Sequence, residues 1–198
     1  MLDRLTKIPG YDFGTTRVAH SPLGLDELRA LEASVGWTDA DAAVLRKAAP
    51  ILIPQAEAMV DAWRAEIARQ PELIRWFCRP DGKPDDKYRA RVKRRFVQWV
   101  IDALTRPHDQ AWLDYQEEIG LRHTPAKKNL TDGTQTPDRV PLRYLVSFVA
   151  AVAQSVRGFL GGQGLADDEM DAMCQAWLKA VLLHITLWCR PYVKDGLW

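Results

Sequence analysis

The sequence predicts an all-α protein. Apolar residues recur at spacings of three and four along several long segments, which is the period of one face of an α-helix. Proline and glycine clusters separate these segments, and no segment sustains the alternation of apolar and polar residues that is typical of a half-buried strand. The pattern therefore predicts about eight helices of unequal length, without an internal repeat.

The composition is that of an ordinary globular domain. The chain has 198 residues, of which 47% are hydrophobic and 27% charged, so residues 1–198 can form a single domain with a sizeable core. The formal net charge of +1 gives no overall field that would attract polyanions, and we expect no nucleic-acid partner.

Cysteine use and hydropathy indicate a cytoplasmic, non-membrane protein. Cys78, Cys174 and Cys189 are odd in number and lack a Cys-x-x-Cys pair, which suits reduced thiols. The N-terminus carries no apolar run of signal-peptide length. The most apolar stretch, 144–156, is shorter than the ~20 residues that a membrane helix needs, so no membrane partner is expected.

Residues 1–22 are expected to form an N-terminal arm. Turn-forming residues surround Tyr11 and Phe13, which predicts an extended chain packed over the surface. Helices follow, with Thr38 as an N-cap for the second and Pro54 at the start of the third. The predicted helices span 25–33, 42–51, 55–69 and 71–77, and a turn follows at 79–84.

The segment 88–104 predicts a helix with one apolar face and several basic faces. Val92, Phe96 and Trp99 keep the three-four rhythm, while the Arg and Lys residues between 89 and 95 mostly take the other faces. A basic run of this kind is usually a solvated helix face. Arg95 lies nearest the apolar border, and it is the best placed to contact an anionic group at the edge of a pocket.

The next segment, 112–123, predicts a helix that carries a histidine at its end. Trp112, Tyr115, Ile119 and His123 share one helical face, and a proline two positions beyond His123 is a helix stop signal. A histidine at the end of an apolar face is either a core residue satisfied by a hydrogen bond or a ligand to a buried group. Spacing alone favours the core residue.

The last third of the chain continues the helical pattern. A polar loop at 126–137 precedes predicted helices at 141–159 and 167–192, with a glycine-rich joint between them. The glycine cluster follows no strand, so it is not a dinucleotide-binding loop. His184 lies among apolar residues of the last helix and is the only serious rival to His123, although a packed core histidine is the favoured interpretation.

A helical bundle with many aromatic residues and a histidine at the end of an inward face suits a flat apolar cofactor such as haem. Haem would require a neutral imidazole, an apolar opposite side and basic groups near its propionates, and the chain can supply each. Other chemistry is disfavoured, because the four histidines lack a His-Glu-x-x-His spacing, no Cys/His cluster suits zinc, and no Gly-x-Ser-x-Gly elbow indicates a hydrolase.

Ordered sequence blocks extend over nearly the whole chain, and together they match a known family. The blocks include Ile8-Pro9-Gly10-Tyr11, Arg79-Pro80-Asp81-Gly82, Arg95-Phe96-Val97-Gln98-Trp99, Ala111-Trp112-Leu113-Asp114-Tyr115, Ile119-Gly120-Leu121-Arg122-His123 and Gln175-Ala176-Trp177. With these blocks the chain resembles the protoglobins, single-domain haem proteins related to the sensor domain of globin-coupled sensors.

The resemblance implies a globin-like helical fold with an N-terminal extension that encloses haem b. It implies that His123 is the proximal ligand of the haem iron, in place of the core role that spacing favours. It also implies a homodimer through the last two long helices. On the distal side the family's positions match Trp63, Phe96 and, one turn earlier, Val92, and its pocket-lining aromatics match Phe77 and Phe148.

Two positions depart from the family pattern. Arg64 stands where relatives carry a tyrosine able to bond a bound gas, and Thr124 replaces a histidine that follows the proximal one. A guanidinium is never neutral, so Arg64 either turns to a propionate or solvent, or points inward and stabilises an anionic ligand. Thr124 removes a possible rival ligand.

The function that the resemblance implies is reversible binding of oxygen, carbon monoxide or nitric oxide at a His-ligated iron, for gas binding or sensing. The alternative is a haem enzyme such as a nitric oxide dioxygenase or weak peroxidase, which an inward Arg64 would favour because a cationic donor stabilises a leaving oxygen anion. The partners expected are therefore diatomic gases.

Overall fold

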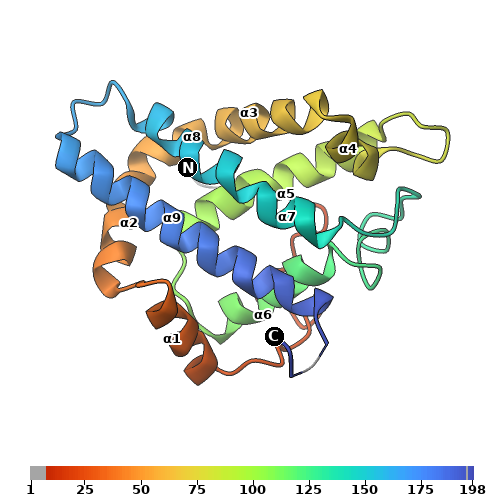
Figure 1. Ribbon diagram of the computed structural model, residues 1–198, viewed down its shortest axis with the longest axis horizontal. Helices are drawn as coiled ribbons and strands as arrows, with labels where there is room; N and C mark the ends of the chain where they lie inside the picture. The colour runs from red at the N-terminus through yellow and green to blue at the C-terminus, as the bar shows by residue number, and fades with distance from the viewer. Residues whose placement is uncertain (1–7, 195) are drawn as a thin grey trace, which may run out of the picture.

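The computed structural model describes residues 8–194 and 196–198, and in these residues the chain forms nine α-helices and no β-strand (Figure 1). The predicted all-α class is confirmed. The helices are α1 (Leu25–Ser34), α2 (Asp39–Leu52), α3 (Ala56–Arg69), α4 (Pro71–Ile74), α5 (Asp86–Thr105), α6 (Gln110–Leu121), α7 (Leu142–Ser147), α8 (Val149–Leu160) and α9 (Asp167–Cys189). Short 3₁₀ turns follow α2, α4 and α9, at Ile53–Gln55, Arg75–Phe77 and Arg190–Tyr192.

Local capping explains several helix boundaries. The backbone N–H of Thr38 donates to the carboxylate of Asp41 at 2.8 Å, which completes the cap at the start of α2. The carboxylate of Asp85 accepts from the backbone N–H of Tyr88 at 3.0 Å, so α5 begins two residues before the range predicted from its apolar face. α6 ends at Leu121, and His123 lies just past it as predicted.

The predicted single helix at 141–159 is wrong, because the chain forms two helices that break at Phe148. Phe148 lies between α7 and α8, and its backbone N–H bonds to the carbonyl oxygens of Tyr144 and Val146 at the end of α7. No proline or glycine marks this break, and the apolar residues continue across it. The break accounts for the one helix more than the sequence predicts.

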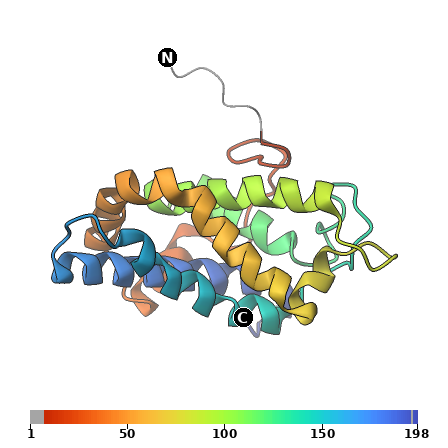
Figure 2. The same cartoon turned by 90° about the horizontal axis from the view of Figure 1, so that it is seen from above.

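The described part of the N-terminal arm, residues 8–22, has no helix and lies over α5 and α6 (Figure 2). The hydroxyl of Tyr11 donates to Asp102 of α5 at 2.7 Å, and the guanidinium of Arg106 lies 3.7 Å from the centre of the Phe13 ring. These contacts fit the packing role that the sequence predicts for this segment. Residues 1–7 of the predicted arm lie outside the described residues.

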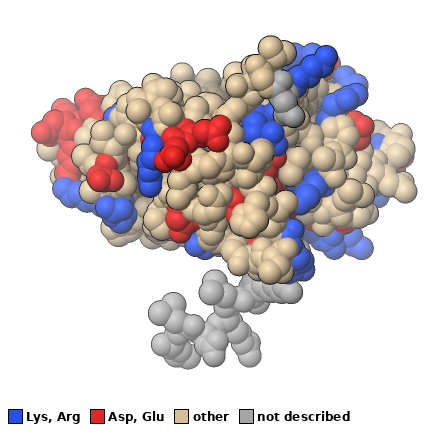
Figure 3. Space-filling view, turned by 90° about the horizontal axis from the view of Figure 1, so that it is seen from below, with Lys and Arg blue, Asp and Glu red and all other residues tan. Residues whose placement is uncertain are grey.

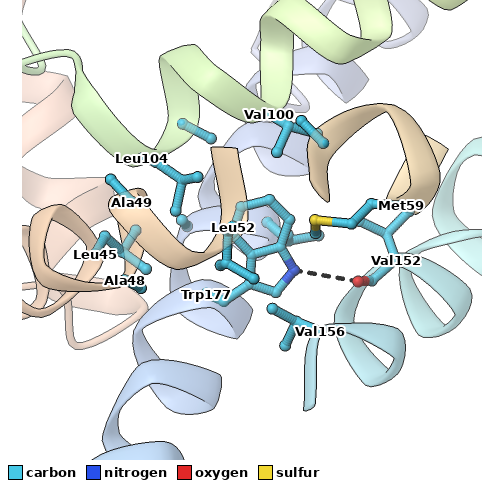
Figure 4. Packing of buried hydrophobic residues seen from close by; sticks show 14 of the residues in the cluster. Leu45, Ala48, Ala49, Leu52, Met59, Val100, Leu104, Val152, Val156 and Trp177 are labelled. Carbon is cyan, nitrogen blue, oxygen red and sulfur yellow. Dashed lines mark hydrogen bonds between the residues drawn. The ribbon is translucent and has the colours of Figure 1, made fainter. Parts of the chain in front are cut away.

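The main hydrophobic core lies between α2, α3, α5, α8 and α9, with Trp177 of α9 fully buried at its centre (Figure 4). The indole N–H of Trp177 donates to the backbone carbonyl of Val152 at 3.1 Å, so this large side chain is buried without a lost hydrogen bond. A smaller cluster joins α1, α6 and α9 through Leu28, Trp112 and Leu183. α9 takes part in both clusters and is the central helix of the fold.

α9 and the turn after it, Asp167–Tyr192, are long and apolar enough to cross a membrane by length and composition. This apolar segment is longer than 144–156, the stretch from which the sequence predicts no membrane span. Half of its most apolar window is buried inside the structure, where α9 packs against α2, α6 and α8. The central helix of many globular proteins has the same length and composition, so this feature is weak evidence of a membrane span.

Charged side chains of both signs are interspersed on the face drawn in Figure 3, with uncharged surface between them. The face in Figure 3 therefore presents no continuous field of one sign, in keeping with the net charge of +1. Charged groups also pair between helices: the ammonium of Lys93 lies 2.8 Å from Asp61 and 2.7 Å from Glu57, which joins α5 to α3.

His184 of α9 is a packed core histidine, as the sequence favours. His184 is 1% exposed, and its Nδ1 accepts a hydrogen bond of 3.1 Å from the indole Nε1 of Trp99. The proton of the neutral ring is therefore on Nε2, which is buried and has no partner within the described part of the chain. Burial lowers the pKa of His184 to about 3, so the ring is neutral near pH 7.

α6 crosses α9 closely at Gly120, where a side chain would force its neighbours to shift. A Cβ atom on Gly120 would lie 3.1 Å from the Cγ of Pro191 and 3.1 Å from the Cα and carbonyl oxygen of Trp188. Backbone atoms cannot move aside as the end of a flexible side chain can. Gly120 therefore sets the depth at which the last turn of α6 meets the end of α9.

Gly120→Ala is expected to lower the free energy of unfolding by about 1–3 kcal/mol, because the added methyl group overpacks this crossing. The matched control is Gly158→Ala in α8, where a Cβ would meet nothing within 4 Å. There the change is expected to raise the free energy of unfolding by up to about 1 kcal/mol, because alanine favours the helix. Urea unfolding measures both, and equal effects at the two positions would contradict the close crossing.

His184→Gln is expected to weaken the dependence of stability on pH. The folded pKa of His184 lies below its ordinary value of 6.5, so the unfolded chain binds the extra proton and stability falls as pH drops below about 6.5. Glutamine still offers an oxygen to Trp99 but does not titrate. Urea unfolding between pH 7.5 and 5 should give a slope smaller by about 1 kcal/mol per pH unit than in the wild type. An unchanged slope would mean that His184 is not buried in its neutral form.

Candidate functional site

A largely apolar cavity of about 250 Å³ lies among α3, α5, α6, the loop after α6, α8 and α9. Side chains from helices far apart in the sequence form its wall, and the histidine that follows α6 is among them. The apolar part of the wall includes Ile67, Leu73, Val92, Phe96, Phe148 and Ile185. The cavity is concave and mostly apolar with a few polar groups, which is the character of a ligand pocket.

The structure brings seven of the eight predicted site residues to this cavity. They are His123, Arg64, Phe77, Val92, Arg95, Phe96 and Phe148. Trp63 does not line the cavity: it is 1% exposed, its ring packs 5.1 Å from the Phe96 ring, and its indole N–H donates to Ser155 at 2.6 Å. Trp63 therefore backs Phe96 from within the core, because its face of α3 turns toward α8.

The side chain of His123 is held as a neutral imidazole. Its Nδ1 lies 2.8 Å from the backbone carbonyl oxygen of Ile119, one turn earlier, so Nδ1 carries the proton and donates it. Nε2 then carries the lone pair and has no hydrogen-bond partner among the described residues. Burial lowers the pKa of His123 to about 4, which keeps the ring uncharged near pH 7. A neutral imidazole whose other nitrogen donates to a carbonyl is the form that ligates a metal.

The main chain and ring of His123 are also fixed. Its carbonyl oxygen accepts from the backbone N–H of Val140 at 2.8 Å and lies 2.9 Å from the hydroxyl of Tyr192. The ring of Trp188 lies nearly parallel to the imidazole, with centroids 5.9 Å apart and planes 18° apart. The imidazole is therefore held by α6, by the end of the polar loop and by the end of α9.

Arg64 lies in the cavity wall at its solvent edge. Its guanidinium is 3.2 Å from the carboxylate of Asp61, three residues earlier on α3, and its side chain is about a quarter exposed. Of the two orientations that the sequence leaves open, this pairing corresponds to the outward one. α5 contributes two apolar side chains to the cavity wall, Val92 and Phe96, which lie one turn apart.

Arg95 already has an anionic partner in the protein. Its guanidinium bonds both carboxylate oxygens of Asp132, at 3.0 and 2.5 Å, and donates to the backbone carbonyl of Pro9 at 2.8 Å. The side chain of Asp132 is only 3% exposed. Arg95 therefore joins α5 to the polar loop and to the N-terminal arm, and its charge is balanced within the wall.

Lys128 is a wall residue that the sequence did not reveal. It is 2% exposed, and its ammonium donates to the carbonyls of Trp76 and Pro137 at 2.9 and 2.7 Å and to the hydroxyl of Thr136 at 2.6 Å. Burial lowers the pKa of Lys128 to about 8. In the sequence it follows another lysine in a polar loop, which is typical of an exposed residue, and only the fold turns it inward.

The single imidazole of His123 suits a metal ion that is already coordinated by other ligands when it binds the protein. No cluster of three or more His, Cys, Asp or Glu side chains suited to a metal ion occurs in the part of the chain that the structure describes. A single neutral imidazole facing an apolar cavity cannot hold a bare ion, because structural and catalytic metal sites need several protein ligands. It can hold an iron that a macrocycle already coordinates, as in haem proteins.

Comparisons with known proteins agree with this fold. Among solved structures, the globin domain of the Geobacter sulfurreducens globin-coupled sensor is 15% identical with a TM-score of 0.67, and the alignment covers 84% of this chain and 97% of that domain. The ferric globin domain of E. coli DosC is 12% identical with a TM-score of 0.62, covering 83% and 97%. No curated protein matches the chain at a significant level.

Identities this low show the fold alone, which is that of a globin domain, as the resemblance implies. The family itself follows from the sequence match. A family model described as Protoglobin matches residues 25–198, which include α1 to α9 and every predicted site residue. Membership of a globin family implies haem binding, and the chain belongs to the protoglobin family.

Proposed function

We propose that this chain binds haem b in the cavity, with Nε2 of His123 as the protein ligand of the iron, and that the haem-loaded chain binds oxygen, carbon monoxide or nitric oxide. The observation that carries the proposal is the imidazole of His123: neutral, with its Nδ1 proton fixed on Ile119, at the wall of an apolar cavity. Haem supplies the iron that takes up a gas reversibly. The chain holds the imidazole, excludes water and limits the polar groups near the gas.

The alternative of a haem enzyme has less support. A nitric oxide dioxygenase or peroxidase gains from a cationic donor beside the bound oxygen, and Arg64 is the residue that could supply it. Its guanidinium is instead paired with Asp61 at the solvent edge, and Arg95 is paired with Asp132. We therefore propose a gas-binding role, and gas sensing is its extension by analogy with the sensor domains that share the fold.

Three further expectations are proposals of the same kind. We propose a homodimer through α8 and α9, a cytoplasmic location and no membrane or nucleic-acid partner. The first is supported by family resemblance and by Leu182 of α9, which is 38% exposed although α9 is the central helix. The others rest on composition and net charge.

His123→Gly is expected to remove the histidine signature from the absorption spectrum of the haem-loaded protein. Added imidazole should restore that signature by occupying the space left on the iron. Spectra of the ferric, dithionite-reduced and carbon monoxide-treated protein measure both effects. The matched control is His184→Gln, at a buried histidine that does not itself line the cavity, which should leave all three spectra unchanged. A wild-type protein that gives no haem spectrum would contradict the proposed function. Loss of the histidine signature in His184→Gln but not in His123→Gly would contradict the assignment of His123 as the ligand.

Arg64→Leu is expected to leave the oxygen dissociation rate within about twofold of the wild type, because a hydrogen bond that is absent cannot be lost. Stopped-flow spectroscopy measures the rate. Asp61→Asn is the companion variant, since it weakens the hold on the guanidinium and lets it turn inward, which should slow dissociation. A rise of about tenfold or more in Arg64→Leu would correspond to the loss of a charge-assisted bond and would show that Arg64 points inward.

A further inference from the structure

Aromatic rings form a continuous path from the candidate iron ligand to the far side of α6. Each neighbouring pair has ring centroids between 4.0 and 6.0 Å apart, and four of the five pairs have planes within about 30° of parallel. The path runs through His123, Trp188, His184, Trp112, His108 and Trp37. We call these six residues the aromatic relay.

We propose that the aromatic relay carries single electrons from Trp37 to the haem. An oxidant that reacts in the cavity would then oxidise Trp37, at the surface, instead of a buried side chain. This inference rests on the proposed haem at His123. Electron tunnelling falls off exponentially with distance, so closely spaced rings transfer electrons far faster than saturated side chains over the same span. Indole is among the side chains that are easiest to oxidise, and the two buried imidazoles bridge the gaps between indoles.

The interior of the relay is dry, which preserves a radical in transit. Trp112 and His184 are each 1% exposed, and the side chain of His108 is 7% exposed and bonded to Glu32 at 2.6 Å. Trp37, at the end of the relay away from the cavity, is partly exposed, as Trp188 is at the cavity wall. Trp37 stacks on His108 with centroids 4.9 Å apart, and it is the point away from the cavity at which a reductant in solution can reach the relay.

The core also offers a branch without an exit. Trp99 lies 5.6 Å from Trp188, and from there rings continue to Trp177 and Trp63 at 5.7 and 6.3 Å. Trp177 and Trp63 are 0% and 1% exposed, so an oxidised ring there has no access to a solution donor. A tryptophan radical on this branch can therefore be reduced only by an electron that arrives through Trp188 or His184.

The oxidant that we name is hydrogen peroxide, as an occasional source of damage to a gas-binding haem and not as the substrate of the peroxidase disfavoured above. Its O–O bond breaks and it becomes two water molecules by taking two electrons and two protons, the protons coming from solvent. The relay supplies the electrons one at a time: each indole gives an electron toward the haem and is refilled from its neighbour on the Trp37 side. Two molecules of a one-electron donor of the ascorbate or phenol class each lose one electron at Trp37, which completes the balance.

The test treats haem-loaded protein with hydrogen peroxide in the absence of a reductant, and locates oxidised tryptophan by peptide mass spectrometry. Trp37 is expected to be oxidised before Trp198, although Trp198 is 38% exposed and would be attacked first by an oxidant in solution. Haem-free protein should show no such preference. Added ascorbate should suppress oxidation at Trp37.

Two buried tryptophans give a matched pair of variants. Trp112→Phe interrupts the relay away from the cavity and should reduce oxidation of Trp37 to the level of haem-free protein, because phenylalanine is much harder to oxidise. Trp177→Phe, at an equally buried ring on the branch without an exit, should leave oxidation of Trp37 unchanged. Should Trp112→Phe fail to fold, Trp37→Phe at the surface should prolong the tryptophan radical signal in electron paramagnetic resonance, because the exit is gone.

Oxidation that appears first at Trp198, or at Tyr11 in the cavity wall, would overturn the relay while leaving haem binding intact. Equal effects of Trp112→Phe and Trp177→Phe would also overturn it. A protein whose absorption spectrum never shows bound haem would overturn both the relay and the proposed function, so the two failures are distinguishable.

Discussion

The site depends on one hydrogen bond, from Nδ1 of His123 to the backbone carbonyl of Ile119. This bond spans four residues, so the side chain takes up a carbonyl that the backbone of α6 leaves free where the helix ends. It fixes the tautomer and the direction of the ring together. The position of α6 is in turn fixed by its close crossing with α9 at Gly120. The close packing of α6 on α9 at Gly120, which involves no functional side chain, therefore determines the position of the His123 imidazole.

The cations around the cavity are mostly neutralised or fully bonded by the protein itself. Asp132 holds Arg95, Asp61 holds Arg64, and three oxygens surround the ammonium of Lys128. Leaving such charges unpaired in an apolar wall would be costly, so the polar loop supplies partners before any ligand enters. The loop is thereby tied to α5 and to the arm, and the cavity keeps its shape through buried polar bonds as well as through apolar packing.

Local patterns in the sequence predicted much of the fold. Helical periodicity, caps and prolines located most helices. The apolar face ending at His123 left a core histidine and a ligand both open, and only the family resemblance chose the ligand. The partners of Arg95 and Lys128 could not be predicted, because Asp132 and Trp76 are distant in sequence and the loop looks solvated. The break at Phe148 has no local signal, since the backbone turns there without proline or glycine. Family resemblance matched Trp63 to the distal side, but only the packing of α3 against α8 shows that it stands behind Phe96.

The choice of residues around His184 is hard to explain by packing alone. Leucine or phenylalanine could fill the same volume, whereas His184 leaves its Nε2–H buried without a partner in the described residues, at a cost of about 1–3 kcal/mol. Its Nδ1 fixes Trp99, and its ring fills the gap between Trp188 and Trp112. The unsatisfied Nε2–H thus belongs to His184, whose ring lies between the cavity-wall residue Trp188 and the part of the relay that leads to Trp37. A core built only for stability would avoid this cost, and an electron path gives a physical reason for keeping it.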